Sequence, residues 1–247
     1  MNSNEINSNR WLKPAFAIAI ALVLSSTVLG WFFAKAKKPD EAITVTGSAR
    51  KRIKADLVIW SATVTYQSEK ATDAYKSLSE SIPRVKQYLI SKGISDSEIT
   101  ISAVTTTAVR KTNENGVGTS EISGYALKQS LEVRSSDVDK VAAVARQATE
   151  LINQNILIES NAPEFLYTKL GDMKIEMLGD AAADAKTRAE RIAASTGSKV
   201  GSVRSAKMGV IQVTAADSTD VSDEGISDTS SIDKDIAAVV NVSFAVN

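Results

Sequence analysis

The sequence predicts an α+β protein, in which an N-terminal transmembrane helix precedes a body of helices packed on a largely antiparallel sheet. Three observations lead to this prediction. Residues 14–34 are apolar and uncharged. Beyond them, stretches with an apolar residue at every second position alternate with stretches of helical spacing, in the order ββαββαβαββ. The helices follow pairs of strands, which is typical of an antiparallel α+β body.

The apolar run is long enough to cross a membrane. Its 21 residues would form a helix about 30 Å long, the thickness of a bilayer's hydrocarbon core. Trp11 and Trp31 stand near its ends, as interfacial aromatic residues do. We expect a short tail at 1–13, an uncleaved anchor at 14–34 and a linker at 35–41. A cleaved secretion signal is the alternative, because Ala34-Lys35-Ala36 imitates a cleavage site. The flanking charges leave the orientation open.

Composition excludes several classes of function. The chain has 29 basic and 29 acidic residues, so no net field favours nucleic acid. It contains neither Cys nor His, which removes Ser-His-Asp and Cys-His catalysis and the usual zinc ligands. We therefore expect no catalytic residue, no metal ligand, no cofactor and no identifiable small-molecule substrate. The part beyond the anchor is long enough for one good core, or for two small lobes in contact.

The first body elements are two strands and a helix. Residues 41–67 read as two extended stretches around a basic turn, ARKRIK at 49–54. One face of the second stretch is apolar throughout and should face the core: Val58, Trp60, Ala62, Val64 and Tyr66. The helix from residue 71 should end at Gly93, and Pro83 should kink it or start a new turn. Its expected inner face comprises Ala71, Ala74, Tyr75, Leu78, Ile82, Val85 and Leu89.

The middle of the body reads as a hairpin, a helix and a strand. Residues 97–111 and 121–136 are the hairpin strands, with a turn at Asn115-Gly116. A short helix follows, which Ser136 can cap. Its expected inner face comprises Val138, Val141, Ala142, Ala145 and Ala148. The strand at 156–167 contains Pro163, which indicates an edge or a bulge.

The last elements are a long Ala-rich helix at 170–196 and two closing strands, 199–214 and 235–246. An acidic loop at 215–235 should join the closing strands. It could offer oxygen ligands to Ca²⁺, but its Asp spacing does not fit an EF-hand, so a mobile acidic loop is the preferred interpretation. Its carboxylates are Asp217, Asp220, Asp223, Glu224, Asp228, Asp233 and Asp235, against the one basic residue Lys234.

Other candidate sites have simpler structural explanations. Gly47, Gly93 and Gly124 fit backbone requirements better than phosphate binding. The GVG at 116–118 lacks the strand and helix of a dinucleotide loop, and Tyr125 is expected to be a core aromatic residue.

The basic cluster at 49–54 could touch anionic lipid or another subunit, but a solvated turn is preferred. Carboxylates one turn apart on the long helix, Asp180 with Asp184 and Glu176 with Asp180, are interleaved with basic residues, which suggests solvated ion pairs rather than an acid–base pair.

An ordered set of short motifs resembles a known family. The set begins with Val45-Thr46-Gly47, Asp56 at the start of a strand, and Leu-x-x-x-Gly-Ile from Leu89 to Ile94. It continues with SEITIS at 97–102, the pair Gly124-Tyr125, and an Ala-rich helix leading to Gly-x-x-x-Gly at 197–201. Together they resemble the SIMPL (DUF541) family of bacterial envelope proteins, over residues 42–247.

The resemblance implies a periplasmic or surface location, no established enzymatic activity, and assembly into large homo-oligomers in some members. It favours export of the body, so we expect a single-pass inner-membrane protein whose periplasmic domain self-associates and supports tolerance of envelope or oxidative stress. A secreted, monomeric module that binds a ligand or protein after leader cleavage is the alternative. A carboxylate-dependent hydrolase is a third, less favoured hypothesis.

Overall fold

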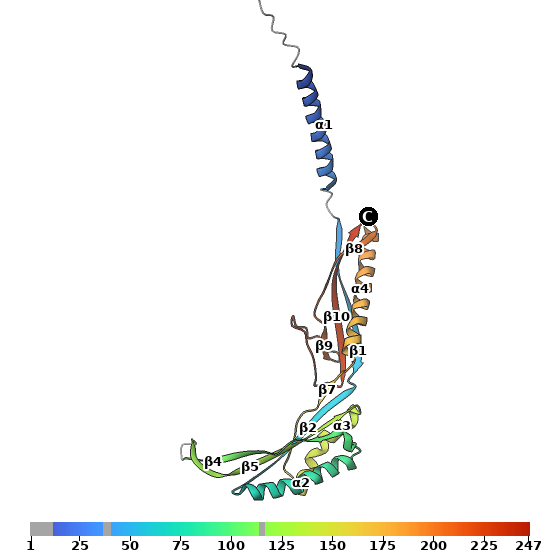
Figure 1. Ribbon diagram of the computed structural model, residues 1–247. Helices are drawn as coiled ribbons and strands as arrows, with labels where there is room; N and C mark the ends of the chain where they lie inside the picture. The colour runs from blue at the N-terminus through green and yellow to red at the C-terminus, as the bar shows by residue number, and fades with distance from the viewer. Residues whose placement is uncertain (1–11, 37–40, 114–116) are drawn as a thin grey trace, which may run out of the picture.

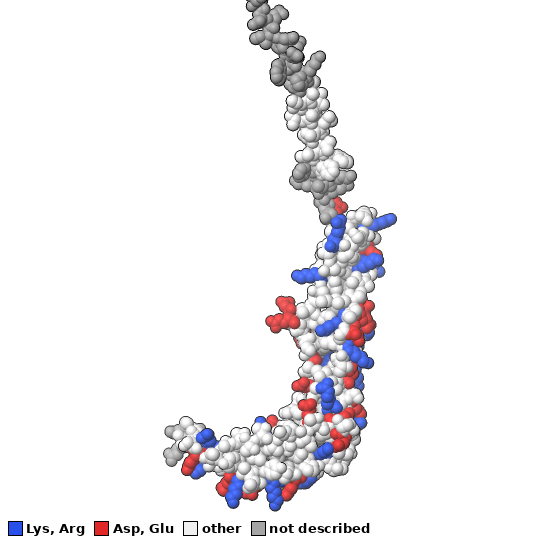
Figure 2. Space-filling view, in the orientation of Figure 1, with Lys and Arg blue, Asp and Glu red and all other residues white. Residues whose placement is uncertain are grey.

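The computed structural model describes residues 12–36, 41–113 and 117–247. Helix α1 (Leu12–Ala36) contains the expected anchor, and side chains are described for residues 16–32 of it. Within these described residues, no helix combines the length and the apolar character that a membrane crossing requires. The predicted tail at 1–13 and linker at 35–41 fall largely outside the described residues. Figure 2 shows the described side chains of α1 uncharged, whereas acidic and basic residues intermingle over the body.

The body is α+β, as expected, but it contains two antiparallel sheets rather than one. Figure 1 shows one sheet with α4 (Leu170–Ser195) nearer to α1, and the other sheet, with α2 (Ala71–Ser91) and α3 (Val138–Gln147), beyond it. We call these parts lobe A and lobe B. Each has its own cluster of buried apolar residues. Two lobes in contact were one of the two arrangements that the chain length allowed.

Lobe A joins the two ends of the body. Strand β1 (Ala42–Lys54) pairs antiparallel with β10 (Asp233–Val246) along its full length. Strands β8 (Val200–Met208) and β9 (Gln212–Ala215) pair with β10 on its other side. The predicted closing strands therefore pair, with the first one interrupted at 209–211. Helix α4 (Leu170–Ser195) covers one face and ends as predicted before Gly197, whose φ is +76°.

Gly47 allows the close approach of α4 to β1. A Cβ atom at this position would lie 2.1 Å from the carbonyl oxygen of Ala181 and 2.4 Å from the backbone nitrogen of Ala185. Small residues on the facing side of the helix complete this contact, since Ala181, Ala185 and Ala189 are fully buried. Gly47 therefore has a structural role, because a side chain at this position would clash with α4.

Lobe B contains the second of the two strands predicted within residues 41–67. Strand β2 (Leu57–Ser68) lies between β5 (Gly118–Ser135) on one side and the short β6 (Ile158–Ser160) and β7 (Glu164–Leu166) on the other. Its predicted inner face is confirmed: Val58, Trp60, Ala62 and Val64 are buried and Tyr66 packs against them. The single strand expected at 156–167 is two strands, because Pro163 lies in the break between them.

Helix α2 (Ala71–Ser91) packs on this sheet and ends before Gly93, whose φ is +89°. It continues through Pro83 as one helix. Because proline has no N–H, the carbonyl of Ser79, four residues before Pro83, receives no helical hydrogen bond. Both residues are exposed, so water can bind that carbonyl instead. The predicted inner face is buried or partly buried except for Tyr75, whose side chain is 56% exposed; its inclusion was wrong.

Helix α3 (Val138–Gln147) is capped by Asp137, not by Ser136. The Asp137 carboxylate accepts a hydrogen bond from the Lys140 backbone N–H at 3.2 Å. The predicted inner face of this helix is confirmed, since all five residues are buried. A 3₁₀ segment (Ala148–Gln154) continues from it.

The predicted hairpin projects from lobe B as a long two-stranded arm (Figure 1). Strand β3 (Ile99–Ile101) and strand β4 (Thr105–Thr112) both pair with β5. The expected turn at Asn115-Gly116, and with it part of the GVG at 116–118, lies outside the described residues. Gly124 lies within β5, where a Cβ would come 2.6 Å from the Ser68 carbonyl oxygen, and Tyr125 is partly buried against the core.

Candidate functional site

The basic cluster at 49–54 is the end of strand β1, and the prediction of a solvated turn was wrong. The chain turns one step later, at Ala55 and Asp56. There the Ala55 N–H donates to the Ile232 carbonyl at 2.9 Å, and the Asp56 carboxylate accepts from the Thr168 backbone N–H at 2.7 Å. Pairing with β10 sends alternate side chains of the cluster to opposite faces. Lys51 reaches α4, where its Nζ lies 2.6 Å from Glu176 Oε1.

On the face opposite α4, two arginines surround a buried carboxylate. Arg52 Nε lies 2.9 Å from Asp235 Oδ1, and Arg50 Nη2 lies 3.1 Å from Asp235 Oδ2. The Asp217 backbone N–H donates to the same carboxylate at 2.9 Å, and Arg52 also pairs with the Asp217 side chain. Hydrogen bonds from Arg52 and Asp217 lower the pKa of Asp235 from 3.8 to about 2.

The neighbouring residue of β10 forms a second buried pair. The Lys234 side chain is 1% exposed, and its Nζ donates to Asp228 Oδ2 at 3.0 Å and to the Asp228 carbonyl at 2.6 Å. Burial raises the pKa of Asp228, but hydrogen bonds from Ser230, Lys234 and Ser231 outweigh this effect and hold the pKa well below 3.8. These two pairs fix the ends of the acidic segment to β10.

The acidic segment 215–235 is therefore packed against lobe A rather than free. The Val213 N–H donates to the Ile226 carbonyl at 2.8 Å, and the Asp228 N–H donates to the Val213 carbonyl at 2.9 Å. Gln212 Nε2 donates to the Ser222 carbonyl at 2.7 Å. In the part of the chain that the structure describes, no group of three or more acidic side chains is arranged to hold a metal ion.

Two of the three carboxylates singled out on the long helix, Glu176 and Asp184, form ion pairs with basic residues. Asp184 accepts from the Ser48 backbone N–H and from Arg188 Nε, each at 2.8 Å. These two hydrogen bonds, the one from Ser48 first, lower the pKa of Asp184. Glu176 pairs with Lys51. None of Glu176, Asp180 and Asp184 lines either of the two pockets described next.

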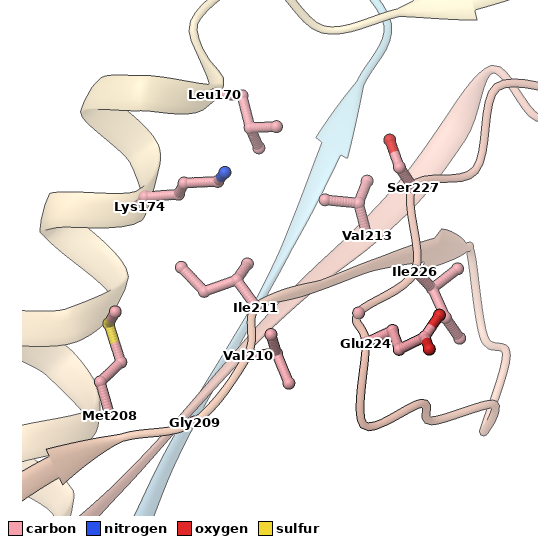
Figure 3. A pocket seen from close by; sticks show the side chains of 11 residues that line it. Leu170, Lys174, Met208, Gly209, Val210, Ile211, Val213, Glu224, Ile226 and Ser227 are labelled. Atoms are coloured by element: carbon pink, nitrogen blue, oxygen red, sulfur yellow. The ribbon is translucent and has the colours of Figure 1, made fainter.

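The packed acidic segment creates a pocket of about 410 Å³, which we call pocket 1. Figure 3 shows its walls: the start of α4, the end of β8 with the 209–211 connection after it, and residues 224–227. Most of the lining is apolar, with Lys174 and Glu224 as its charged side chains. The lining consists of Leu170, Lys174, Met208, Gly209, Val210, Ile211, Val213, Glu224, Gly225, Ile226 and Ser227.

A second pocket of about 290 Å³, pocket 2, adjoins it where the lobes meet. The two share Leu170, Val213 and Ser227. Pocket 2 also contacts the Asp228–Lys234 pair and Arg134 of β5. Sequence reasoning missed both pockets, because their residues come from separated segments. The one sequence feature that pointed to pocket 2 was Lys234, the single basic residue in the acidic segment.

Comparison with known families gives one result. The model of the family described as "SIMPL: Protein of unknown function (DUF541)" matches residues 43–244. No curated protein matches the chain. The match covers both lobes and pocket 1.

Proposed function

The chain belongs to the SIMPL (DUF541) family, and from this premise we propose that it is a non-enzymatic bacterial envelope protein. Residues 14–34 hold it at the inner membrane as an uncleaved anchor, and the two-lobed body lies in the periplasm, where it self-associates. This role includes support of tolerance to envelope or oxidative stress.

The exposure of α1 is the observation that carries the anchor proposal. Every described side chain from Phe16 to Phe32 is exposed, among them Phe16 at 72% and Trp31 at 63%. Such a surface is unfavourable in water and favourable in lipid. Ser25, Ser26 and Thr27 donate their hydroxyl protons to carbonyls of their own helix at 2.9–3.1 Å. Their polar groups therefore need no partner from the surroundings.

Extraction of membranes tests the anchor. We expect the full-length chain to resist sodium carbonate and to leave the membrane only with detergent, with its N-terminus intact by mass spectrometry. Leu24→Lys should weaken insertion, because a lysine at the helix centre costs about 2.5–3.5 kcal/mol, and Leu24→Ala is the matched control. A soluble chain that begins near residue 37 would refute the anchor and favour the secreted alternative.

The projecting arm supports self-association. Among the described strands, β4 pairs only with β5, so its outer backbone edge has no strand partner. The arm also exposes Val117 at 60% and Ile122 at 50%. A two-stranded ribbon is marginally stable alone, and an open edge is a site for pairing with another chain.

Light scattering of the detergent-solubilised protein should therefore give a multi-subunit mass. Thr107→Pro, which disrupts the arm's edge, should reduce that mass, whereas Thr72→Pro in the first turn of α2 is the control. A monomeric wild type would refute self-association. For the stress role, a strain lacking the protein should lose viability in peroxide and regain it with the wild-type chain; equal survival would refute that part.

A binding module is the second candidate, favoured by pocket 1. This alternative predicts a periplasmic, monomeric body, released by cleavage of the leader, with a saturable response to a ligand or partner protein.

A further inference from the structure

Pocket 1 has the composition of a site for an amphipathic molecule. Its apolar wall is formed by Leu170, Ile211 and Val213, which pack against or belong to the lobe A core, and by the more exposed Met208 and Val210. Small-molecule sites are concave and mostly apolar, with few polar groups that fix orientation.

Lys174 supplies an uncompensated positive charge at this wall. Figure 3 shows its amine directed from α4 toward β9 and the 224–227 segment. Within the described residues, its side chain has no hydrogen bond or ion pair. Two carboxylates further along the same helix have other partners, since Glu176 pairs with Lys51 and Asp184 with Arg188. By contrast, Lys186 further along the same helix pairs with Glu190.

The start of α4 adds to the positive potential. Its N-cap residue, Lys169, makes no side-chain hydrogen bond to the first turn, so the backbone N–H groups there are not capped by a side chain. The positive end of the helix dipole lies beside Leu170, within the pocket lining. Asp172 in the first turn of α4 and Glu224 in the pocket lining contribute opposing negative charges, and neither forms an ion pair with Lys174.

We propose that pocket 1 binds a single aliphatic chain with one anionic head group, the chain against the apolar wall and the head at Lys174. Binding of such a ligand would be a function in addition to the proposed structural role, and it does not depend on the anchor or on self-association. One free cation suits one anionic head. Glu224 disfavours a second negative charge, and the apolar wall gives no counterpart for a wholly polar ligand.

Titration calorimetry of the full-length protein in dodecyl maltoside tests this proposal. Octanoate is the probe, and identical micelles in every sample make partitioning into detergent the same for all variants. We expect saturable binding to the wild type, at least tenfold weaker binding to Lys174→Met, and unchanged binding to the control Lys186→Met. Val210→Trp should block the pocket, and Glu224→Gln should tighten binding a few-fold. Circular dichroism verifies that each variant folds.

Three further probes define the ligand class. Butyrate should bind much more weakly, since it buries less chain, and octylammonium should not bind, since its charge is reversed. Octyl phosphate distinguishes a lipid-type head group from a free carboxylic acid. Binding of octanoate that is equal in Lys174→Met and wild type would overturn the proposal, as would preference for octylammonium. Weaker binding to Glu224→Gln would overturn the monoanion in favour of a zwitterion.

Discussion

Removal of either partner of the buried pair Lys234–Asp228 should have unequal effects on stability. Asp228→Ala leaves a fully buried ammonium with one remaining acceptor, the backbone carbonyl of residue 228 at 2.6 Å. Loss of one partner of a buried pair typically costs about 3–5 kcal/mol. Lys234→Met keeps the apolar stem and leaves the carboxylate 13% exposed, with donors from Ser230 and Ser231 at 2.6–3.2 Å. We therefore expect a cost of about 1–3 kcal/mol.

Urea denaturation of the detergent-solubilised chain, followed by far-UV circular dichroism, measures both values. The double variant should cost less than the sum of the two single variants, because the second change removes the unpaired charge left by the first. Lys186→Met is the control, since its pair with Glu190 is exposed and 3.8 Å long; we expect less than about 1 kcal/mol.

The reasoning would be refuted if Lys234→Met cost as much as Asp228→Ala, or if the two costs were additive. Either result would mean that the buried ammonium is not stabilised mainly by the Asp228 carboxylate.

Three further changes probe other contacts. Gly47→Ala should lower the free energy of unfolding by an amount near the upper end of about 1–3 kcal/mol, because the added Cβ would overlap the backbone of α4. The thermal midpoint should fall accordingly, and an unchanged midpoint would contradict this packing. Gly179→Ala, whose Cβ would meet open space on the same helix, should instead stabilise the protein by about 0.5–1 kcal/mol. Asp235→Asn should flatten the acid dependence of stability. The lowered pKa of Asp235, about 2 against 3.8, gives stability that is present above pH 5 and lost as pH falls toward 2; identical wild-type and variant curves in urea melts at stepped pH would contradict this.

Local periodicity identified the elements of the body well. The alternation in β2 and the three-to-four spacing in α2 and α3 each reflect burial against a neighbouring layer, so the sequence of a single strand or helix is enough to predict it. Tyr75 is an exception because its apolar ring fits the spacing but lies at the edge of the helix face. Pro163 was informative as well, since it marks the break between β6 and β7.

Pairing between distant segments was harder to predict. The cluster at 49–54 has charges on both faces, which resembles a turn, but Lys51 is neutralised by α4 and Arg52 by β10. Those partners lie more than 100 residues away in the chain, so no local pattern contains them. For the same reason, the two extended stretches of residues 41–67 resemble a hairpin, although each belongs to a different sheet.

Pocket 1 was not predictable for a related reason. Val210 and Ile226 are ordinary apolar residues in their own segments, and Lys174 resembles any solvated helix lysine. They form a site only because the acidic segment folds back onto β9, through hydrogen bonds that involve backbone atoms and carry little sequence signal.

The pairing of β1 with β10 also bears on the order in which the chain can fold. The strands, helices and buried core of lobe B all lie within residues 55–166, and Ile232 is the one later residue that packs against that core. Lobe A must wait, because β1 is made first among the body strands and its partner is made last. During synthesis and export, the newly emerged β1 therefore remains unpaired through nearly 200 residues of elongation, until the C-terminal strand arrives. A chain that stops between residues 167 and 232 would keep the strands and helices of lobe B but lose lobe A, and β1 would then be exposed to proteases and to pairing with other chains.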